Sequence, residues 1–134
     1  MPSVYAPASA PGLVLGVGTV GAYLDVGGGA ATCTYLSMDG GLSWKDVAEG
    51  AQIYETGSRG GVVVLAKQAT DGPASEVLFS LDAGDCWHRV ALPESILVDN
   101  VRTDPEGAGA VFAVVGSACA RRDDQSGCTF SGGY

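Results

Sequence analysis

The chain alternates between short apolar runs and clusters of turn-forming residues. Each run is six to eight residues long and is bounded by Gly, Pro, Asp or Ser, which is typical of β-strands joined by turns. No apolar period of 3.6 residues persists long enough to predict a helix. The pattern therefore predicts an all-β chain. The expected strands are 12–18, 34–39, 42–48, 52–57, 62–67, 76–82, 86–91, 96–103 and 111–116.

The expected strands group into repeating units. The four runs between residues 52 and 91 form one unit of about forty residues, the two later runs begin a following unit, and the earlier runs supply most of a preceding one. Units of four strands and about forty residues are the signature of β-propeller blades. The runs 62–66 and 111–115 are continuously apolar, so we expect both to be buried on two faces.

A propeller blade cannot cover both of its faces alone. Typical propellers have four to eight blades or more, and this sequence supplies about two and a half. We therefore expect a partial β-propeller of four-stranded antiparallel blades over residues 11–118, followed by a polar tail or loop over 119–134. The chain is expected to be part of a longer protein, with apolar surface left open at its two outer faces.

The charge of the chain argues against two classes of binding partner, nucleic acids and anionic membranes. The 134 residues are 46% hydrophobic and include 21 glycines, with seven basic and fifteen acidic residues and a net charge of −8. This balance repels nucleic acid and anionic lipid, so neither is an expected partner. Residues 1–24 are uncharged, but prolines and glycines interrupt them, and they resemble neither a signal peptide nor a membrane span.

One eight-residue pattern, S-x-D-x-G-x-x-W, occurs twice. "SMDGGLSW" begins at Ser37 and "SLDAGDCW" begins at Ser80, and the two aspartates lie 43 residues apart. We expect each aspartate to accept backbone N–H bonds of its own turn, each glycine to supply a positive φ, and each tryptophan to anchor the following strand. Cys86 stands where the first copy has a hydroxyl. The pattern residues are Ser37, Asp39, Gly41 and Trp44, then Ser80, Asp82, Gly84 and Trp87.

The aspartates of the two patterns are expected to be structural. Two carboxylates could serve as acid and base in glycoside hydrolysis, but matching positions in successive blades would not converge on one substrate. The first pattern also lacks the further ligands of a calcium loop. His88 has no nucleophile tied to it by a motif, and no Walker lysine follows the glycines at 16–21. We predict no catalytic residue, no metal site and no cofactor.

The four cysteines stand at positions 33, 86, 119 and 128, without the paired C-x-x-C spacing of a structural zinc site. A disulfide between Cys119 and Cys128 would close a short polar loop. Free thiols are the alternative, and a bridge between Cys33 and Cys86 is less favoured.

The repeated pattern resembles the Asp-box, a hairpin turn of sialidase-like and sortilin-like propellers. Together with its flanks, the chain resembles the Vps10 domain of sortilin-type sorting receptors over about residues 11–118. The resemblance rests on "PGLVLGVGTVGAYL", on "TYLSMDGGLSWKDVAEGAQIYETGSRGGVVVLA", and on "EVLFSLDAGDCW", "ILVDNVRTDPEG" and "VFAVVG" in that order.

The resemblance implies a receptor and not an enzyme. Family members have a ten-bladed luminal propeller, a cysteine-rich module, one membrane span and a cytosolic tail, and they carry soluble cargo between Golgi, endosome and vacuole. It therefore implies peptide or protein cargo as the partner and the lumen of Golgi or endosomal membranes as the location. This segment itself would not contact the membrane. The alternatives are a fragment of an Asp-box glycosidase or a non-catalytic structural propeller.

The resemblance also implies that cargo binds within the propeller tunnel. If the first strand of each blade lines that tunnel, Glu55, Asp99 and Arg102 could face it, because they lie on "QIYETG" and "ILVDNVRT". These three residues are the sequence's candidates for a contact with cargo.

Overall fold

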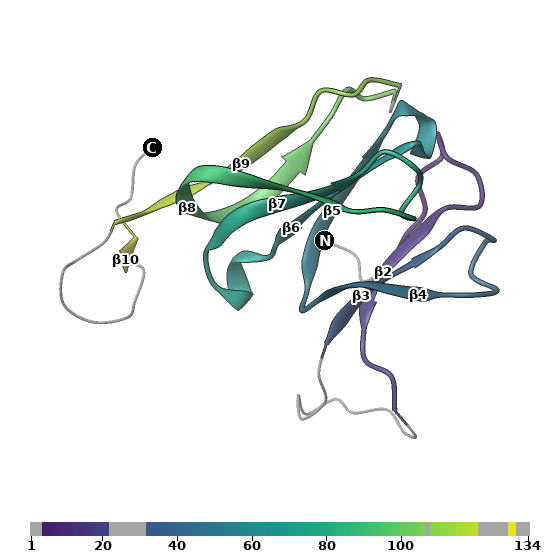
Figure 1. Cartoon of the computed structure of the whole chain (residues 1–134), viewed down its shortest axis with the longest axis horizontal. Coiled ribbons are helices and arrows are strands. Elements are labelled where there is room, and N and C mark those ends of the chain that lie inside the picture. Colours follow the sequence, from purple (N-terminus) through teal and green to yellow (C-terminus); the bar gives the residue numbers. More distant parts are fainter. Residues whose placement is uncertain (1–3, 22–31, 107, 121–128, 131–134) are drawn as a thin grey trace.

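The computed structural model describes residues 4–21, 32–106, 108–120 and 129–130. These residues form ten β-strands and two single-turn 3-10 helices, η1 (Ser58–Gly60) and η2 (Ala69–Asp71). The prediction of an all-β chain is confirmed. All ladders between the strands are antiparallel, and two sheets follow one another along the chain (Figure 1).

The first sheet has four strands in chain order: β1 (Val4–Tyr5), β2 (Val14–Gly18), β3 (Cys33–Ser37) and β4 (Lys45–Glu49). Strand β1 lies before the region in which the sequence predicted strands. It has only two residues, so it shows no alternation of apolar and polar positions that could reveal it. With β1 in place, the first sheet is a complete four-stranded unit.

The second sheet has six strands, also paired with their neighbours in the chain, and it curls strongly in Figure 1. Its first three strands and residues 88–91 of the fourth occupy the unit predicted between residues 52 and 91. Its strands are β5 (Gln52–Gly57), β6 (Val62–Lys67), β7 (Ala74–Ser80), β8 (His88–Arg102), β9 (Ala113–Ala120) and β10 (Thr129–Phe130).

Strand β8 corrects the sequence prediction, which placed two separate strands at 86–91 and 96–103. Residues 88–91 of β8 pair with β7 and residues 96–102 pair with β9, and Ile96 also pairs with Ala74 of β7. Between them, residues 92–95 bulge, because only Ser75 of β7 lies opposite them. Pro93 lacks an N–H and suits extended backbone, so the chain passes from one unit to the next without a turn. Each part of β8 thus belongs to a different unit.

The first hydrophobic core lies between the two sheets. It joins Leu15 and Leu36 of the first sheet to Tyr54, Val63 and Leu65 of the second, and each of these side chains is at most 2% exposed. Burial of this kind removes apolar surface from water and holds the sheets face to face.

A second core lies on the opposite side of β6. There Val64 and Ala66 pack with Val98 and Val101 of β8. The run 62–66 is therefore buried on both faces, as predicted. The run 111–115 is not, because no sheet among the described residues covers its outer side; Val111 is 84% exposed and Val115 is 47% exposed. A core between the two sheets and a second core between the two units of the curled second sheet are consistent with part of a propeller.

Candidate functional site

The first strands of the three units come together at one edge of the molecule. Tyr5 of β1 stacks on Tyr54 of β5, with the ring centroids 5.9 Å apart. Leu15 and Val64 each follow the residue that pairs with the first serine of a repeated turn, and Ala113 matches Val64 when the runs 62–66 and 111–115 are aligned. Their partners on the first strands are Tyr5, Glu55 and Arg102. Tyr5, Glu55 and Arg102 therefore occupy the same place in three successive units, which we call the inner position.

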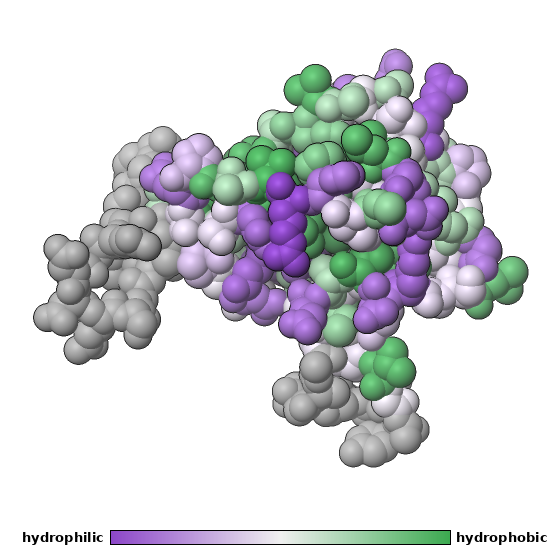
Figure 2. All heavy atoms as spheres, in the orientation of Figure 1, coloured by the Kyte–Doolittle hydropathy of each residue, from purple (hydrophilic) through white to green (hydrophobic). Residues whose placement is uncertain are grey.

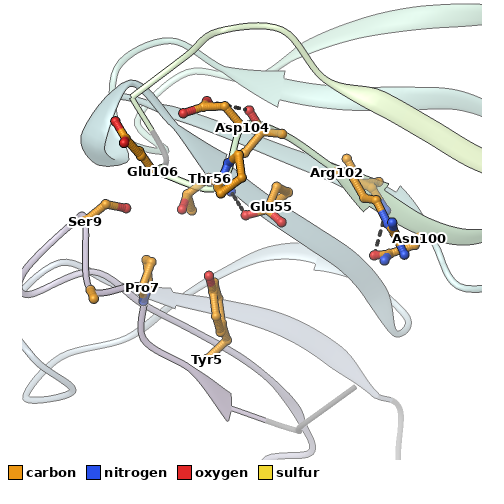
Figure 3. Close-up of a pocket in the computed structure, with 13 residues that line it drawn as sticks. Tyr5, Pro7, Ser9, Glu55, Thr56, Asn100, Arg102, Asp104 and Glu106 are labelled. Atoms are coloured by element: carbon orange, nitrogen blue, oxygen red, sulfur yellow. Dashed lines mark hydrogen bonds between the residues drawn. The ribbon is translucent and has the colours of Figure 1, made fainter.

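The three inner positions line one cleft of about 590 Å³ (Figure 3). In Figure 3 the segment with Tyr5 and Pro7 lies on one side, the strand with Glu55 and Thr56 in the middle, and the segment from Asn100 onward on the other side. The lining residues are Tyr5, Pro7, Ala8, Ser9, Glu55, Thr56, Asn100, Val101, Arg102, Thr103, Asp104, Pro105 and Glu106.

The cleft carries charges of both signs. The Oε1 atom of Glu55 accepts a hydrogen bond of 2.9 Å from the backbone N–H of Thr56. Burial, together with the negative charge of Glu55, raises the pKa of Tyr5. Among the described residues, no ion pair includes Glu55, Arg102 or Glu106. These three groups are therefore available to a ligand.

Asp104 differs from the other charged residues of the cleft. Its carboxylate accepts backbone N–H bonds from Gly109 at 2.7 Å and from Ala108 at 3.1 Å, and a hydroxyl bond from Thr103. The backbone bond from Gly109 contributes most to the lowering of the Asp104 pKa. This carboxylate therefore holds the loop at the rim of the cleft in shape.

The first repeated turn, residues 37–44, is held by its own polar side chains. The Oγ of Ser37 donates to Asp39 Oδ1 at 2.8 Å and accepts the N–H of Gly41 at 2.9 Å. Asp39 in turn accepts the backbone N–H and the hydroxyl of Ser43. These bonds, led by that from the Ser43 hydroxyl, lower the pKa of Asp39 to about 2. Gly41 has a φ of 96°, which favours glycine.

The second repeated turn, residues 80–87, repeats this arrangement. The Oγ of Ser80 donates to Asp82 Oδ1 at 2.7 Å and accepts the N–H of Gly84 at 2.8 Å. Asp82 also accepts the N–H of Cys86 at 2.8 Å, and this bond contributes most to lowering its pKa to about 2. The neighbouring Asp82 carboxylate raises the pKa of the Cys86 thiol, which stands in place of Ser43.

The tryptophans of the two turns have different surroundings. Trp87 is half-buried and packs against the core between the sheets, whereas Trp44 is 45% exposed and donates its indole N–H to Gly41 at 2.9 Å. A Cβ atom on Gly84 would lie 2.2 Å from Leu36 of the first sheet, while Gly41 has only Trp44 nearby. The second turn is therefore in contact with a neighbouring sheet, and the first turn has no such contact among the described residues.

Comparison with known proteins agrees with the arrangement of the sheets. Residues 1–101 match the model of the Sortilin-Vps10 family, described as Sortilin, neurotensin receptor 3. The chain belongs to the Sortilin-Vps10 family. The match covers both repeated turns and the first two units.

Individual relatives of this Sortilin-Vps10 chain have the name vacuolar protein sorting/targeting protein 10. The protein of Talaromyces marneffei is 45% identical over 113 residues, and that of Talaromyces stipitatus is 36% identical over 113 residues. The protein of Mycosarcoma maydis is 36% identical over 119 residues. Each alignment covers 84% of this chain and 7% of the relative, so the chain spans less than a tenth of these relatives' length.

In the structure of the Sortilin-Vps10 chain, two of the three residues proposed from the sequence as cargo contacts line the cleft and the third does not. Glu55 and Arg102 line the cleft, whereas Asp99 is exposed and is not among the lining residues. Asp99 lies where the pairing of β8 with β9 shifts, between Val98 and Asn100. The sequence did not indicate Tyr5, because β1 is too short to be recognised.

The loop residues of the cleft were also missed. Asp104 and Glu106 lie outside the expected strands, and only the fold brings them to the cleft. One local signal was present: "TDPEG" places an aspartate before proline and glycine, a pattern that favours a turn closed by the aspartate side chain.

The remaining expectations concern cysteines, metals and the membrane. Cys33 and Cys86 are free thiols, and the predicted bridge between Cys119 and Cys128 falls outside the described side chains.

In the described part of the chain, no group of three or more His, Cys, Asp or Glu residues could hold a metal ion. None of the described helices has the length and apolar character needed to cross a bilayer.

Proposed function

We propose that this chain is a cargo-binding segment of a vacuolar sorting receptor. Its relatives are sorting and targeting proteins of much greater length, so the sorting activity belongs to the longer protein and the segment contributes a binding surface to it. The observation that carries the proposal is the cleft built from Tyr5, Glu55 and Arg102, the matching inner positions of three successive units.

The cleft suits a peptide segment of a cargo protein. Arg102 can pair with a carboxylate of the cargo, and Glu55 and Glu106 can pair with its basic groups. Tyr5, Ala8 and Pro105 offer apolar contacts beside these charges, and the few charged groups can fix the orientation of a ligand. We place this binding in the lumen of Golgi or endosomal membranes, where such receptors meet soluble cargo.

The proposal assigns the segment binding and not catalysis. The carboxylates of Asp39 and Asp82 accept hydrogen bonds of their own turns, and their pKa values of about 2 keep them ionised at physiological pH. A general acid of a glycosidase needs a raised pKa so that it can donate a proton. The depressed values therefore favour a structural role for both aspartates over an acid–base pair.

The test replaces cleft residues in the complete receptor that contains this segment. We expect Glu55→Ala with Arg102→Ala to weaken cargo binding at least about tenfold, because each hydrogen bond to a charged group contributes about 1.5–3 kcal/mol. Asp99→Ala is the matched control, since Asp99 is an exposed charge of the same strand as Arg102 outside the cleft. The readouts are binding by the purified luminal domain and the fraction of soluble vacuolar hydrolases that cells secrete.

Unchanged cargo binding by the double variant, with thermal stability equal to that of the unmodified receptor, would contradict the role of the cleft. Equal losses in the double variant and in Asp99→Ala would indicate a general effect of charge and would also contradict it.

A further inference from the structure

Strand β5 borders the cleft with a backbone edge that no other strand of the described chain pairs with. It is the last strand in the order of the second sheet, and we call its side away from β6 the inner edge. The N–H of Gln68 donates to the carbonyl of Ala51, and the pairing with β6 then continues without a shift. Because N–H groups alternate between the two sides of a strand, those of the even-numbered residues point to the inner edge.

Two of these N–H groups bond to neighbouring units. The N–H of Gln52 donates to the hydroxyl of Thr34 in the first sheet at 3.1 Å. The N–H of Ser58, just beyond β5, donates to the carbonyl of Gly109 in the third unit at 2.8 Å. The two ends of the inner edge are therefore closed by the units on either side.

The middle of this edge is closed by a side chain of the strand itself. The N–H of Thr56 donates to Oε1 of Glu55, the residue before it, at 2.9 Å. Thr56 is only 2% exposed, so this donor has little access to water and depends on the carboxylate for its partner. The bond uses one of the two carboxylate oxygens of Glu55, and the charge of the group still faces the cleft.

Residues 96–102 of β8 repeat the arrangement in the next unit. The N–H of Val101 donates to Oδ1 of Asn100, again the residue before it, at 2.9 Å. Val98 forms a single parallel bridge with Gln68; because β9 pairs with Val98 on its other side, this bridge lies at the inner edge of β8. Both of the side chains that close an edge line the cleft, and Figure 3 draws their bonds as dashed lines.

The outer edge of the second unit is protected differently. Residues 88–91 of β8 pair with β7 on one side and with no described strand on the other. Arg89 and Glu76 form an exposed ion pair of 3.1 Å there, and Figure 2 shows hydrophilic residues where β7 and β8 run in Figure 1. Charged side chains are a common protection of an exposed edge. At the inner edges the backbone donors themselves are occupied.

We propose that Glu55 and Asn100 are specificity residues of the cleft, because they close the inner edges of β5 and β8 to backbone pairing. An extended peptide that joins a sheet needs backbone donors at the edge it joins. The inference rests on the cleft being the cargo site proposed above. The cleft then selects cargo by the charged side chains that meet Glu55, Arg102 and Glu106, and it excludes uncharged peptides that bind by adding a strand.

Hydrogen exchange tests the closed edges without any cargo. The luminal domain of the complete receptor is followed by mass spectrometry with fragmentation to single residues. We expect the Thr56 N–H to exchange about tenfold faster in Glu55→Ala than in Glu55→Gln, because glutamine keeps an acceptor at the same place. The Val101 N–H should behave likewise in Asn100→Ala compared with Asn100→Asp. Equal rates within each matched pair would overturn the proposal.

A peptide probe tests the selection. The probe is a fluorescent, uncharged peptide of alternating threonine and valine, and its control carries methyl groups on alternate backbone nitrogens. We expect Glu55→Ala with Asn100→Ala to bind the probe at least about tenfold more tightly than the unmodified receptor does, and not to bind the control. Glu55→Gln with Asn100→Asp should behave like the unmodified receptor.

The outcomes separate this inference from the proposed function. Equal affinity of the unmodified receptor and the double alanine variant for the probe would overturn the inference, whatever the cargo result. If Glu55→Ala with Arg102→Ala leaves cargo binding unchanged, the proposed function fails, while the exchange rates and the probe still decide whether the edges are closed.

Discussion

At the scale of single residues, the serines of the repeated turns are more deeply buried than the aspartates. Ser37 is 1% exposed and Ser80 is fully buried, whereas Asp39 and Asp82 are exposed. Each serine hydroxyl lies between the aspartate and the glycine N–H of the turn. The aspartate side chains are exposed to solvent. Loss of the Ser80 hydroxyl, in contrast, would leave the buried N–H of Gly84 without an acceptor.

Ser80 is fully buried and Ser43 is exposed, so we predict that their substitution by alanine changes the stability unequally. Ser80→Ala removes the acceptor of the Gly84 N–H, which is buried, and should lower the free energy of unfolding by about 1–3 kcal/mol. Ser43→Ala removes an exposed hydroxyl and should change the same quantity by less than about 0.5 kcal/mol. Urea unfolding of both variants checks the prediction, and equal losses would contradict it.

The depressed pKa values predict how stability depends on pH. Asp39 and Asp82 have pKa values of about 2 when folded, below the usual 3.8, so the unfolded chain binds more protons in acid. Their contribution to stability is present above about pH 4 and is lost as the pH falls toward 2. Urea midpoints between pH 5 and pH 2.5 should fall for the unmodified chain and fall less for Asp39→Asn with Asp82→Asn.

The roles of the turn residues were predictable because their bonds span only two to four residues of the chain. The surroundings of the tryptophans were not, since they depend on a second sheet. The candidate cargo contacts show a similar limit. Arg102 lines the cleft, whereas Asp99, at the point where the pairing of β8 with β9 shifts, does not. Such a shift depends on the partner strand and has no signal in the sequence.

At the scale of elements, the sequence predicted most strands but not their continuity. The apolar run 62–67 matches β6 in full, because a continuous apolar run bounded by glycines and turn residues is a clear strand signal. Polar residues and Pro93 separate the runs that β8 joins, so they resemble a turn in sequence. In the structure these residues form a bulge within one strand. The bulge forms because β7 and β9 pair with the residues on either side of it, and neither pairing can be recognised from the local sequence.

The contact between the sheets predicts a difference between two glycines. Gly41 and Gly84 both have positive φ, at 96° and 91°, so alanine strains the backbone similarly at each. At position 84 the new Cβ would also meet Leu36 of the other sheet. Gly84→Ala should therefore be about 1–3 kcal/mol more destabilising than Gly41→Ala.

Thermal and urea unfolding of the two glycine variants check this difference. Leu36→Val should reduce the extra cost at position 84, because it shortens the side chain that the new methyl group meets. Equal costs for the two glycines would contradict a close approach of the sheets at this turn.

At the scale of the whole molecule, the core between the two sheets makes the stability of each sheet depend on the other. Leu36 of the first sheet packs with Val63 and Leu65 of the second, and all three are fully buried. Leu36→Ala should therefore lower the free energy of unfolding by about 2–5 kcal/mol. Urea unfolding should still show a single transition, and two separate transitions would contradict a core shared by the sheets.

The bulge at residues 92–95 has a consequence for how such units can diverge. Beyond the bulge the ladder to β7 has only the pair of Ala74 with Ile96, and the ladder to β9 begins at Ile96. Residues can therefore be inserted or deleted in the bulge while residues 88–91 stay paired with β7 and residues 96–102 stay paired with β9. Evolution can thus change the spacing between neighbouring units at this point while the faces that pack together stay the same. Homologous genes should tolerate length variation at this joint more readily than within β6, where one added residue would exchange the side chains of its two cores.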